Sequence, residues 1–308
     1  MHDYQAEIIS ENLLMSRRLG ESRELREFSQ EVIKSIKKAF IKVSQVKSLF
    51  DEADSRPEIK AELKRMLNEA TGLNDDKTIE IDKKDITAIS NMVYDRFKEN
   101  LVGVYSFLSS QITHNYTAFN VIEYKQFDSS KPDAFALPYD RQQRILLAML
   151  PKTLRHGGMT DTVIHEASHN AAATLDHTYI GNIRAESGSF PRSFQQSARE
   201  DSHFFADDRI SKFSATYALG LPASAVLTPQ QELTARDLIE CSKLVKADTL
   251  LNAAEYITYI IDVLSRHHIQ GSRIWPNEGT SRPKRNDDAR NHRLELTIIE
   301  AVLGLSLH

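Results

Sequence analysis

The sequence has very little of three features that often decide where a protein works and how it is held together. It contains one cysteine among 308 residues, so it can form neither an intramolecular disulfide nor a zinc site built from several thiolates. No apolar run approaches the roughly 20 residues that a membrane-spanning helix needs. The formal net charge is only -4, which gives no reason to expect a nucleic-acid partner. Any metal ion must therefore be bound by His, Asp or Glu.

The first thirty residues also lack the apolar core of a secretory signal peptide. We therefore expect the chain to be cytoplasmic as synthesised, or to leave the cytoplasm through a specialised secretion system. With 41% hydrophobic and 27% charged residues, the composition is that of an ordinary globular protein. The length is sufficient for one large domain, or for a catalytic domain with a helical extension.

Residues 1–114 are predicted to form a helical N-terminal region. Apolar residues recur at helical spacing from residue 21 to residue 50, which indicates a long amphipathic helix. A second helix is expected to begin at Pro57 and to end near Gly72, and a third to cover residues 85–101. This region carries no clustered histidines. We expect it to regulate, deliver or dock the protein, for example by binding a secretion-system component or a chaperone.

Residues 115–308 are predicted to form an α+β domain. Short apolar segments at 121–124 and 144–149 lie between turn residues and indicate strands. Thr160 is expected to cap a helix that runs to about Thr174. The remaining expectations are a loop at 181–202, helices at 229–247 and 248–266, and a final helix that ends near Leu305.

The predicted helix after Thr160 contains the pattern His-Glu-x-x-His. His165 and His169 are four residues apart, so both imidazoles project from one helical face and can bind a single Zn²⁺ ion. Glu166 lies beside the metal, where it can take a proton from the zinc-bound water and pass it to the leaving amine. The zinc ion would lower the pKa of that water toward about 7 and polarise the scissile carbonyl. The pattern therefore predicts a zinc-dependent peptidase.

A catalytic zinc ion needs a third protein ligand and one open coordination position. The residues alone leave this ligand open. Asp176 faces the metal if the chain turns back after Thr174, and Tyr179 would then place a neutral donor where negative charge develops in the transition state. His177 is adjacent and is also a good zinc ligand. The remaining option is a glutamate on a second helix, for which the candidates are Glu186, Glu200 and Glu255.

Beyond the histidine pair, the sequence resembles the aspzincin family of zinc peptidases, which are also called deuterolysin-like. Members follow His-Glu-x-x-His with Gly-Thr-x-Asp-x-x-Tyr-Gly, and this chain matches that motif at Thr174, Asp176 and Tyr179. The resemblance implies that Asp176 is the third zinc ligand and that Tyr179 donates a hydrogen bond to the oxyanion. Ala173 stands where the family motif has its first glycine.

A second stretch, residues 251–259, resembles the aspzincin segment around Asn-Ala-Asp, which lies on a C-terminal helix behind the active site. Lysine-selective members carry acidic residues at the positions of Ala254 and Ile257, so lysine specificity is not implied. The resemblance covers residues of about 140–262 and implies a zincin-like domain with a small sheet and an active-site helix. Secreted aspzincins rely on a signal peptide and disulfides, and neither is found in this sequence. We therefore expect an intracellular or toxin-like member of the family that acts as an effector.

The sequence therefore predicts a zinc metalloendopeptidase that hydrolyses peptide bonds of a protein substrate. Its predicted metal ligands are His165, His169 and Asp176. The strand near residues 144–150 is predicted to be the sheet edge along which an extended substrate lies. Two alternatives remain, namely a binding module that keeps a structural zinc ion and a helical interaction protein that works through its N-terminal helices. Glu166 argues against the first alternative, because a structural zinc site needs no base.

Overall fold

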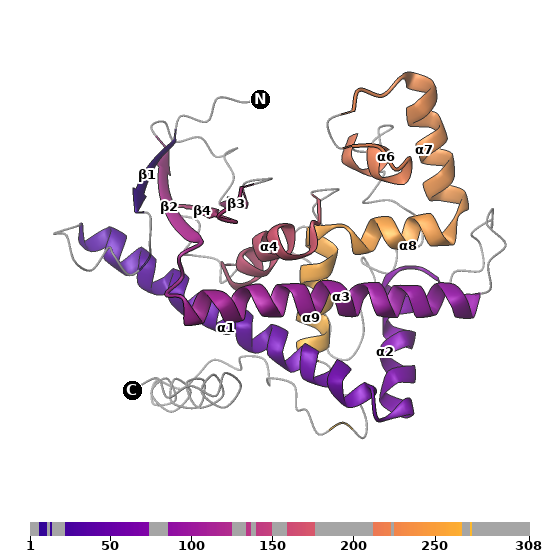
Figure 1. The fold of residues 1–308 in the computed structure, drawn as a ribbon, viewed down its shortest axis with the longest axis horizontal. Helices are drawn as coiled ribbons and strands as arrows, with labels where there is room; N and C mark the ends of the chain where they lie inside the picture. Colours follow the sequence, from indigo (N-terminus) through magenta and orange to yellow (C-terminus); the bar gives the residue numbers. More distant parts are fainter. Residues whose placement is uncertain are drawn as a thin grey trace. The chain divides into compact units, whose positions relative to one another are not determined.

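The described residues form a mixed α+β fold that is mostly helical and contains one four-stranded sheet, which confirms the α+β class. The zincin-like form of that class stays a prediction. A computed structural model gives this fold (Figure 1). Two compact units divide the chain, and each combines segments that are distant in sequence. The residues that the structure describes are 6–10, 13, 22–73, 86–124, 134–136, 140–149, 159–175, 212–222, 225–266 and 272.

The first unit takes its described residues from 1–44 and 103–171 and contains the sheet. The spatial order of the strands is β1-β2-β4-β3. Strand β2 pairs in parallel with β4, while β1 pairs antiparallel with β2 and β3 pairs antiparallel with β4. The strand bounds are Ala6–Ser10 for β1, Phe119–Tyr124 for β2, Ala134–Ala136 for β3 and Ile145–Ala148 for β4.

The two central strands of the sheet are buried on both faces. All four residues of β4 are buried, as are all residues of β2 except Glu123. Strands with both faces covered are often continuously apolar and do not alternate. Strand β4 has this pattern in the sequence, whereas β2 is interrupted by Asn120 and Glu123. Strands β1 and β3 were not predicted, and β1 lies within the N-terminal region that was expected to be helical.

Three helices contribute to the first unit, namely the start of α1 (Arg23–Ala53), the end of α3 (Ile86–Thr113) and α4 (Met159–Ala172). The ring of Phe40 on α1 stacks on Tyr105 of α3 at a centroid distance of 5.4 Å. Lys42 Nζ lies 2.8 Å from Asp161 Oδ1, so an ion pair links α1 to the first turn of α4. The buried apolar residues of α4, such as Val163 and Ile164, and this ion pair together hold α4 within the unit.

The second unit takes its described residues from 45–102 and 172–279 and is helical. The end of α1 and the start of α3 pack here through Phe50, whose ring lies 5.0 Å from Tyr94 and 5.6 Å from Phe97. The other helices of this unit are α2 (Pro57–Ala70), α6 (Lys212–Ala218), α7 (Pro229–Cys241), α8 (Lys243–Leu251) and α9 (Ala254–Arg266).

The predicted helices are confirmed from α1 to α4, with changes at their ends. Helix α3 runs to Thr113, beyond the predicted end at residue 101. The two helices expected over 229–266 are three, because Ser242 and Asn252 separate them. The Ser242 side chain accepts a hydrogen bond from the backbone N–H of Val245 and so caps α8, which explains the first break.

Some expectations concern parts of the chain that the structure does not describe. The predicted loop at 181–202 and the final helix near Leu305 lie outside the described residues. The boundary between residues 114 and 115 stays a prediction, and each compact unit draws segments from both sides of it. Among the described helices, none is both long and apolar enough to cross a membrane.

Candidate functional site

The histidine pattern lies in helix α4, as the sequence predicts. The helix begins at Met159, so Thr160 lies within it and is not the cap that was expected. A continuous buried segment from Val163 to Ser168 contains the first half of the pattern. His165 is 7% exposed and Glu166 is 5% exposed. A buried charged residue beside a buried histidine is uncommon in a purely structural helix, because neither group leaves water without a compensating partner.

The two histidine side chains converge. The Nε2 atoms of His165 and His169 are 3.2 Å apart, and their rings meet edge to face with centroids 4.9 Å apart. Two nitrogen ligands at about 2.0–2.1 Å from one tetrahedral zinc ion lie about 3.3 Å from each other. The pair therefore has the separation that two ligands of a single zinc ion require, and these residues fit the metal that the sequence predicts.

No third ligand is found among the described residues. Among those residues, no group of three His, Cys, Asp or Glu side chains is arranged to hold a metal ion. Glu255 belongs to α9 and is described, so it completes no such group there. The other candidates and the predicted oxyanion donor fall outside the described residues, namely Asp176, His177, Tyr179, Glu186 and Glu200.

The chain that follows α4 has an unusual backbone conformation. Ala173 has a φ of 51°, in the left-handed region that favours glycine. It is the position at which the aspzincin motif has glycine. A residue in this conformation commonly terminates a helix, because it lets the chain turn back and satisfy the last carbonyl groups. The geometry thus explains why a glycine suits this place, although an alanine occupies it here.

The segment after Ala173 is bonded to the break between α8 and α9. The backbone N–H of Leu175 donates to the Asn252 carbonyl at 2.8 Å, and the N–H of Ala254 donates to the Leu175 carbonyl at 3.2 Å. The Asn252 side chain donates to the Ala173 carbonyl at 3.3 Å. The resemblance placed this second stretch on a helix, but Asn252 and Ala253 lie between two helices. Sequence reasoning did not identify Asn252 as the residue that ties the two stretches together.

The predicted substrate strand needs a correction. Strand β4 is interior, because β2 pairs with one side of it and β3 with the other. It therefore offers no open edge to a peptide. Among the described residues, the edges of the sheet are β1 and β3. Whether a strand is at an edge depends on its neighbours in space, which its own sequence does not record.

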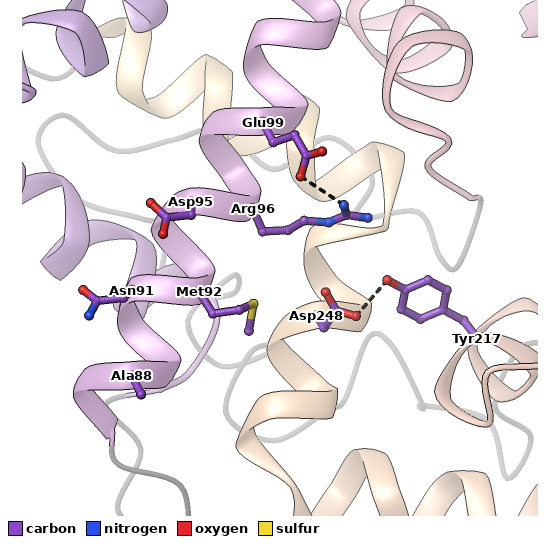
Figure 2. Close-up of a pocket in the computed structure, with 8 residues that line it drawn as sticks. All are labelled: Ala88, Asn91, Met92, Asp95, Arg96, Glu99, Tyr217 and Asp248. Atoms are coloured by element: carbon purple, nitrogen blue, oxygen red, sulfur yellow. Dashed lines mark hydrogen bonds and ion pairs between the residues drawn. The ribbon is translucent and has the colours of Figure 1, made fainter.

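A separate pocket lies in the second unit, where one face of α3 meets α6 and α8 (Figure 2). Its volume is about 820 Å³. Its polar groups pair with each other, since the Tyr217 hydroxyl donates to Asp248 at 2.8 Å and Arg96 lies 3.3 Å from Glu99. Burial and the Asp248 carboxylate raise the pKa of Tyr217 to about 12. The lining residues are Ala88, Asn91, Met92, Asp95, Arg96, Glu99, Tyr217 and Asp248, which offer a polar surface but no nucleophile activated by a base.

Comparison with known proteins adds no family to this picture. No family model, no curated protein and no solved structure matches the chain. The predicted zinc site is therefore supported only by residues of this chain. Its described part is the pair His165 and His169, with the buried carboxyl group of Glu166 between them in sequence.

Proposed function

We propose that this chain is a zinc-dependent endopeptidase. The observation that carries the proposal is the 3.2 Å separation of the Nε2 atoms of His165 and His169 on a helix that buries Glu166 between them. A bare hydrogen bond between two imidazoles gives a similar distance, but it needs no buried carboxyl group at the position where a peptidase has its general base. The combination of the three residues supports catalysis.

Each residue has a defined role in the proposed reaction. His165 and His169 bind the metal through Nε2, and Asp176 is the third ligand by resemblance. A bound zinc ion supplies Lewis acidity, which lowers the pKa of a water molecule and polarises the scissile carbonyl. Glu166 removes the proton of the attacking water and delivers it to the leaving nitrogen. Tyr179 donates a hydrogen bond to the oxygen on which negative charge develops.

The proposed substrate is a polypeptide that lies along a strand edge. An extended peptide that adds to a sheet edge gains backbone hydrogen bonds regardless of its sequence. Strand β3 is the edge next to β4, and β4 is the last described strand before α4. The three residues of β3, Ala134–Ala136, include the partly exposed Phe135. We therefore replace the interior strand β4 with β3 as the proposed substrate strand.

Metal content tests the binding half of the proposal. The purified full-length chain should contain about one zinc ion per molecule, as expected for a mononuclear site. His165→Ala and His169→Ala should each lose the zinc ion, and Asp176→Ala should bind zinc more weakly. A matched control is His114→Ala, because this exposed histidine on the turn after α3 contacts Ser110 and Thr113 at the end of the same helix. Zinc retained in both α4 variants would contradict the site.

Hydrolysis tests the catalytic half. The zinc-loaded chain should cleave an unfolded protein such as reduced casein, and Glu166→Gln should keep its zinc while its rate falls by about 100-fold or more. Loss of both zinc and activity would show only that the variant is damaged, so the zinc content is measured on the same sample. Full activity in Glu166→Gln would exclude the role of general base. Zinc binding without hydrolysis of any protein would indicate a binding module.

A further inference from the structure

A short turn before β4 contacts the end of α4, directly beyond the second histidine. The Asn170 side chain donates a hydrogen bond to the Gln143 carbonyl at 2.8 Å, and the Gln143 side chain donates to the Asn170 carbonyl at 3.4 Å. Asn170 is the residue after His169. Its carbonyl is one of the last four of the helix, which have no partner within the helix itself. The turn thus supplies a partner to the helix end that carries the second proposed ligand.

The turn is held rigidly by one carboxyl group. Asp140 accepts hydrogen bonds from the backbone N–H groups of Gln142 at 3.3 Å and Arg144 at 3.0 Å, and from Arg144 Nε at 2.7 Å. The Asp140 carbonyl also accepts from the N–H of Gln143 at 2.9 Å. Side-chain bonds of an aspartate to the following backbone are the usual way to stabilise a tight turn.

The turn forces Gln143 into a conformation that it would otherwise avoid. Its φ is 52°, in the left-handed region, and its side chain is exposed. Such strain persists only where the surrounding structure imposes it. In this conformation both the carbonyl and the side-chain amide of Gln143 reach Asn170. The strain is therefore the means by which the turn contacts the helix end.

We propose that Gln143 and Asn170 are positioning residues for the metal ligand His169. This inference rests on the proposed metal site and concerns how that site is held. At the next residue of α4, the carbonyl oxygen of Ala171 approaches Gly103 of α3 so closely that a Cβ on Gly103 would lie 2.8 Å from it. The last turn of α4 thus contacts both the Asp140–Arg144 turn and α3. Groups that orient a ligand from outside the coordination shell set metal affinity as well as stability.

Two substitutions of Gln143 separate the contribution of its backbone carbonyl to zinc affinity from that of its side-chain amide. Gln143→Gly and Gln143→Val both remove the side-chain amide. Glycine keeps the left-handed backbone and therefore the carbonyl that accepts from Asn170, whereas a β-branched residue disfavours that conformation. Asn170→Ala removes the donor directly. Gln142→Ala is the matched control, because it changes the neighbouring exposed glutamine and keeps the backbone N–H that bonds to Asp140.

The test measures zinc affinity of the metal-free full-length chain by competition with a chromogenic chelator, together with the melting temperature. Asn170→Ala and Gln143→Val should weaken zinc binding about 10-fold or more at a temperature where both remain folded. Gln143→Gly and Gln142→Ala should bind as the parent does. A merely structural role would lower the melting temperatures of the first two and leave the affinities of the folded chains equal.

The outcomes distinguish this inference from the proposed function. Parent chain that takes up no zinc under metal-replete conditions would overturn the proposed function and the inference with it. Parent chain that binds zinc with the same affinity as Asn170→Ala and Gln143→Val would overturn the inference alone. Equal weakening by Gln143→Gly and Gln143→Val would contradict the role of the Gln143 backbone carbonyl, because loss of the side-chain amide would then account for the whole effect.

Discussion

A Cβ atom placed on Gly103 would lie 2.8 Å from the carbonyl oxygen of Ala171. The two residues belong to α3 and α4, so the helices approach each other at backbone distance at this point. Ala171 lies two positions beyond His169. The close approach therefore determines where the end of the proposed metal-binding helix can lie within the first unit.

Gly103→Ala should destabilise the protein although alanine favours helices. The gain in helix propensity is about 1 kcal/mol, but the new methyl group meets a backbone atom that cannot rotate away, and overpacking of this kind costs about 1–3 kcal/mol. The net loss should appear in the free energy of unfolding measured with urea. Ser106→Ala, at an exposed position of the same helix, should have almost no effect. A more stable Gly103→Ala variant would contradict the close contact.

Ala173→Gly should stabilise the protein. An L-residue in the left-handed conformation costs about 1–2 kcal/mol, and glycine avoids this while losing about 0.5–1 kcal/mol of chain entropy on folding. We expect a net gain of about 0.5–1 kcal/mol, measured by thermal unfolding. Ala172→Gly, one residue earlier and inside α4, should lose about 1 kcal/mol instead. A stability loss at Ala172 and a gain at Ala173 would show that the helix ends between these two alanines. A loss of stability at both positions would contradict the left-handed conformation of Ala173.

Asp140→Asn should change the pH dependence of stability. The Arg144 guanidinium and its backbone N–H, which bond to this carboxylate, lower the pKa of Asp140 below its usual value. A carboxyl group with a lowered pKa in the folded state stabilises the fold above its unfolded pKa, which is about 3.9, and this contribution is lost as the pH falls through the folded pKa. The free energy of unfolding of the parent should therefore exceed that of the variant by the largest amount at neutral pH.

The measurement for Asp140→Asn is the urea midpoint of both chains from pH 7 down to pH 3. The difference between the two midpoints should shrink toward pH 3, because the parent carboxylate becomes protonated. Gln142→Ala should run parallel to the parent over this range, since no titrating group changes. A difference that stays constant with pH would show that the Asp140 charge contributes nothing to the turn.

Asn100→Ala should cause a large loss of stability for an exchange of one polar residue. Asn100 is 2% exposed and its side chain donates to the carbonyl of Leu251, the last residue of α8, at 2.9 Å. Removal of the donor leaves a buried carbonyl without this bond, which costs about 1–3 kcal/mol. Ser106→Ala, at an exposed site on the same helix, should stay within about 0.5 kcal/mol of the parent. Equal losses of unfolding free energy in the two variants would show that the buried hydrogen bond of Asn100 contributes no more than an exposed side chain does.

The elements that the sequence predicts well are those whose information is local. Helices α1 and α2 follow from apolar spacing and from Pro57 at a helix start. The converging imidazoles of His165 and His169 follow from a separation of four residues once the helix is assumed. The burial of these elements was readable because each presents one apolar face over several turns.

The elements that escaped prediction depend on distant partners. Strand β3 has three residues, which is too short for any alternation to appear, and it exists because β4 pairs with it. The interior position of β4 and the tie between Leu175 and Asn252 are likewise set by neighbours in space. The break at Ser242 had a local signal, since serine favours helix starts, but it was read as part of a continuous helix.

The pairing of β1 with β2 has a consequence for how the chain is made. Ala6 pairs with Tyr124, so the first strand leaves the ribosome long before its partner exists. At ordinary rates of synthesis this interval is on the order of ten seconds. During this interval Ile8 and Ser10 have no strand to pair with, and closure of the long intervening loop must await β2. Although β1 is translated before β2, its residues are thus among the last to reach their native place.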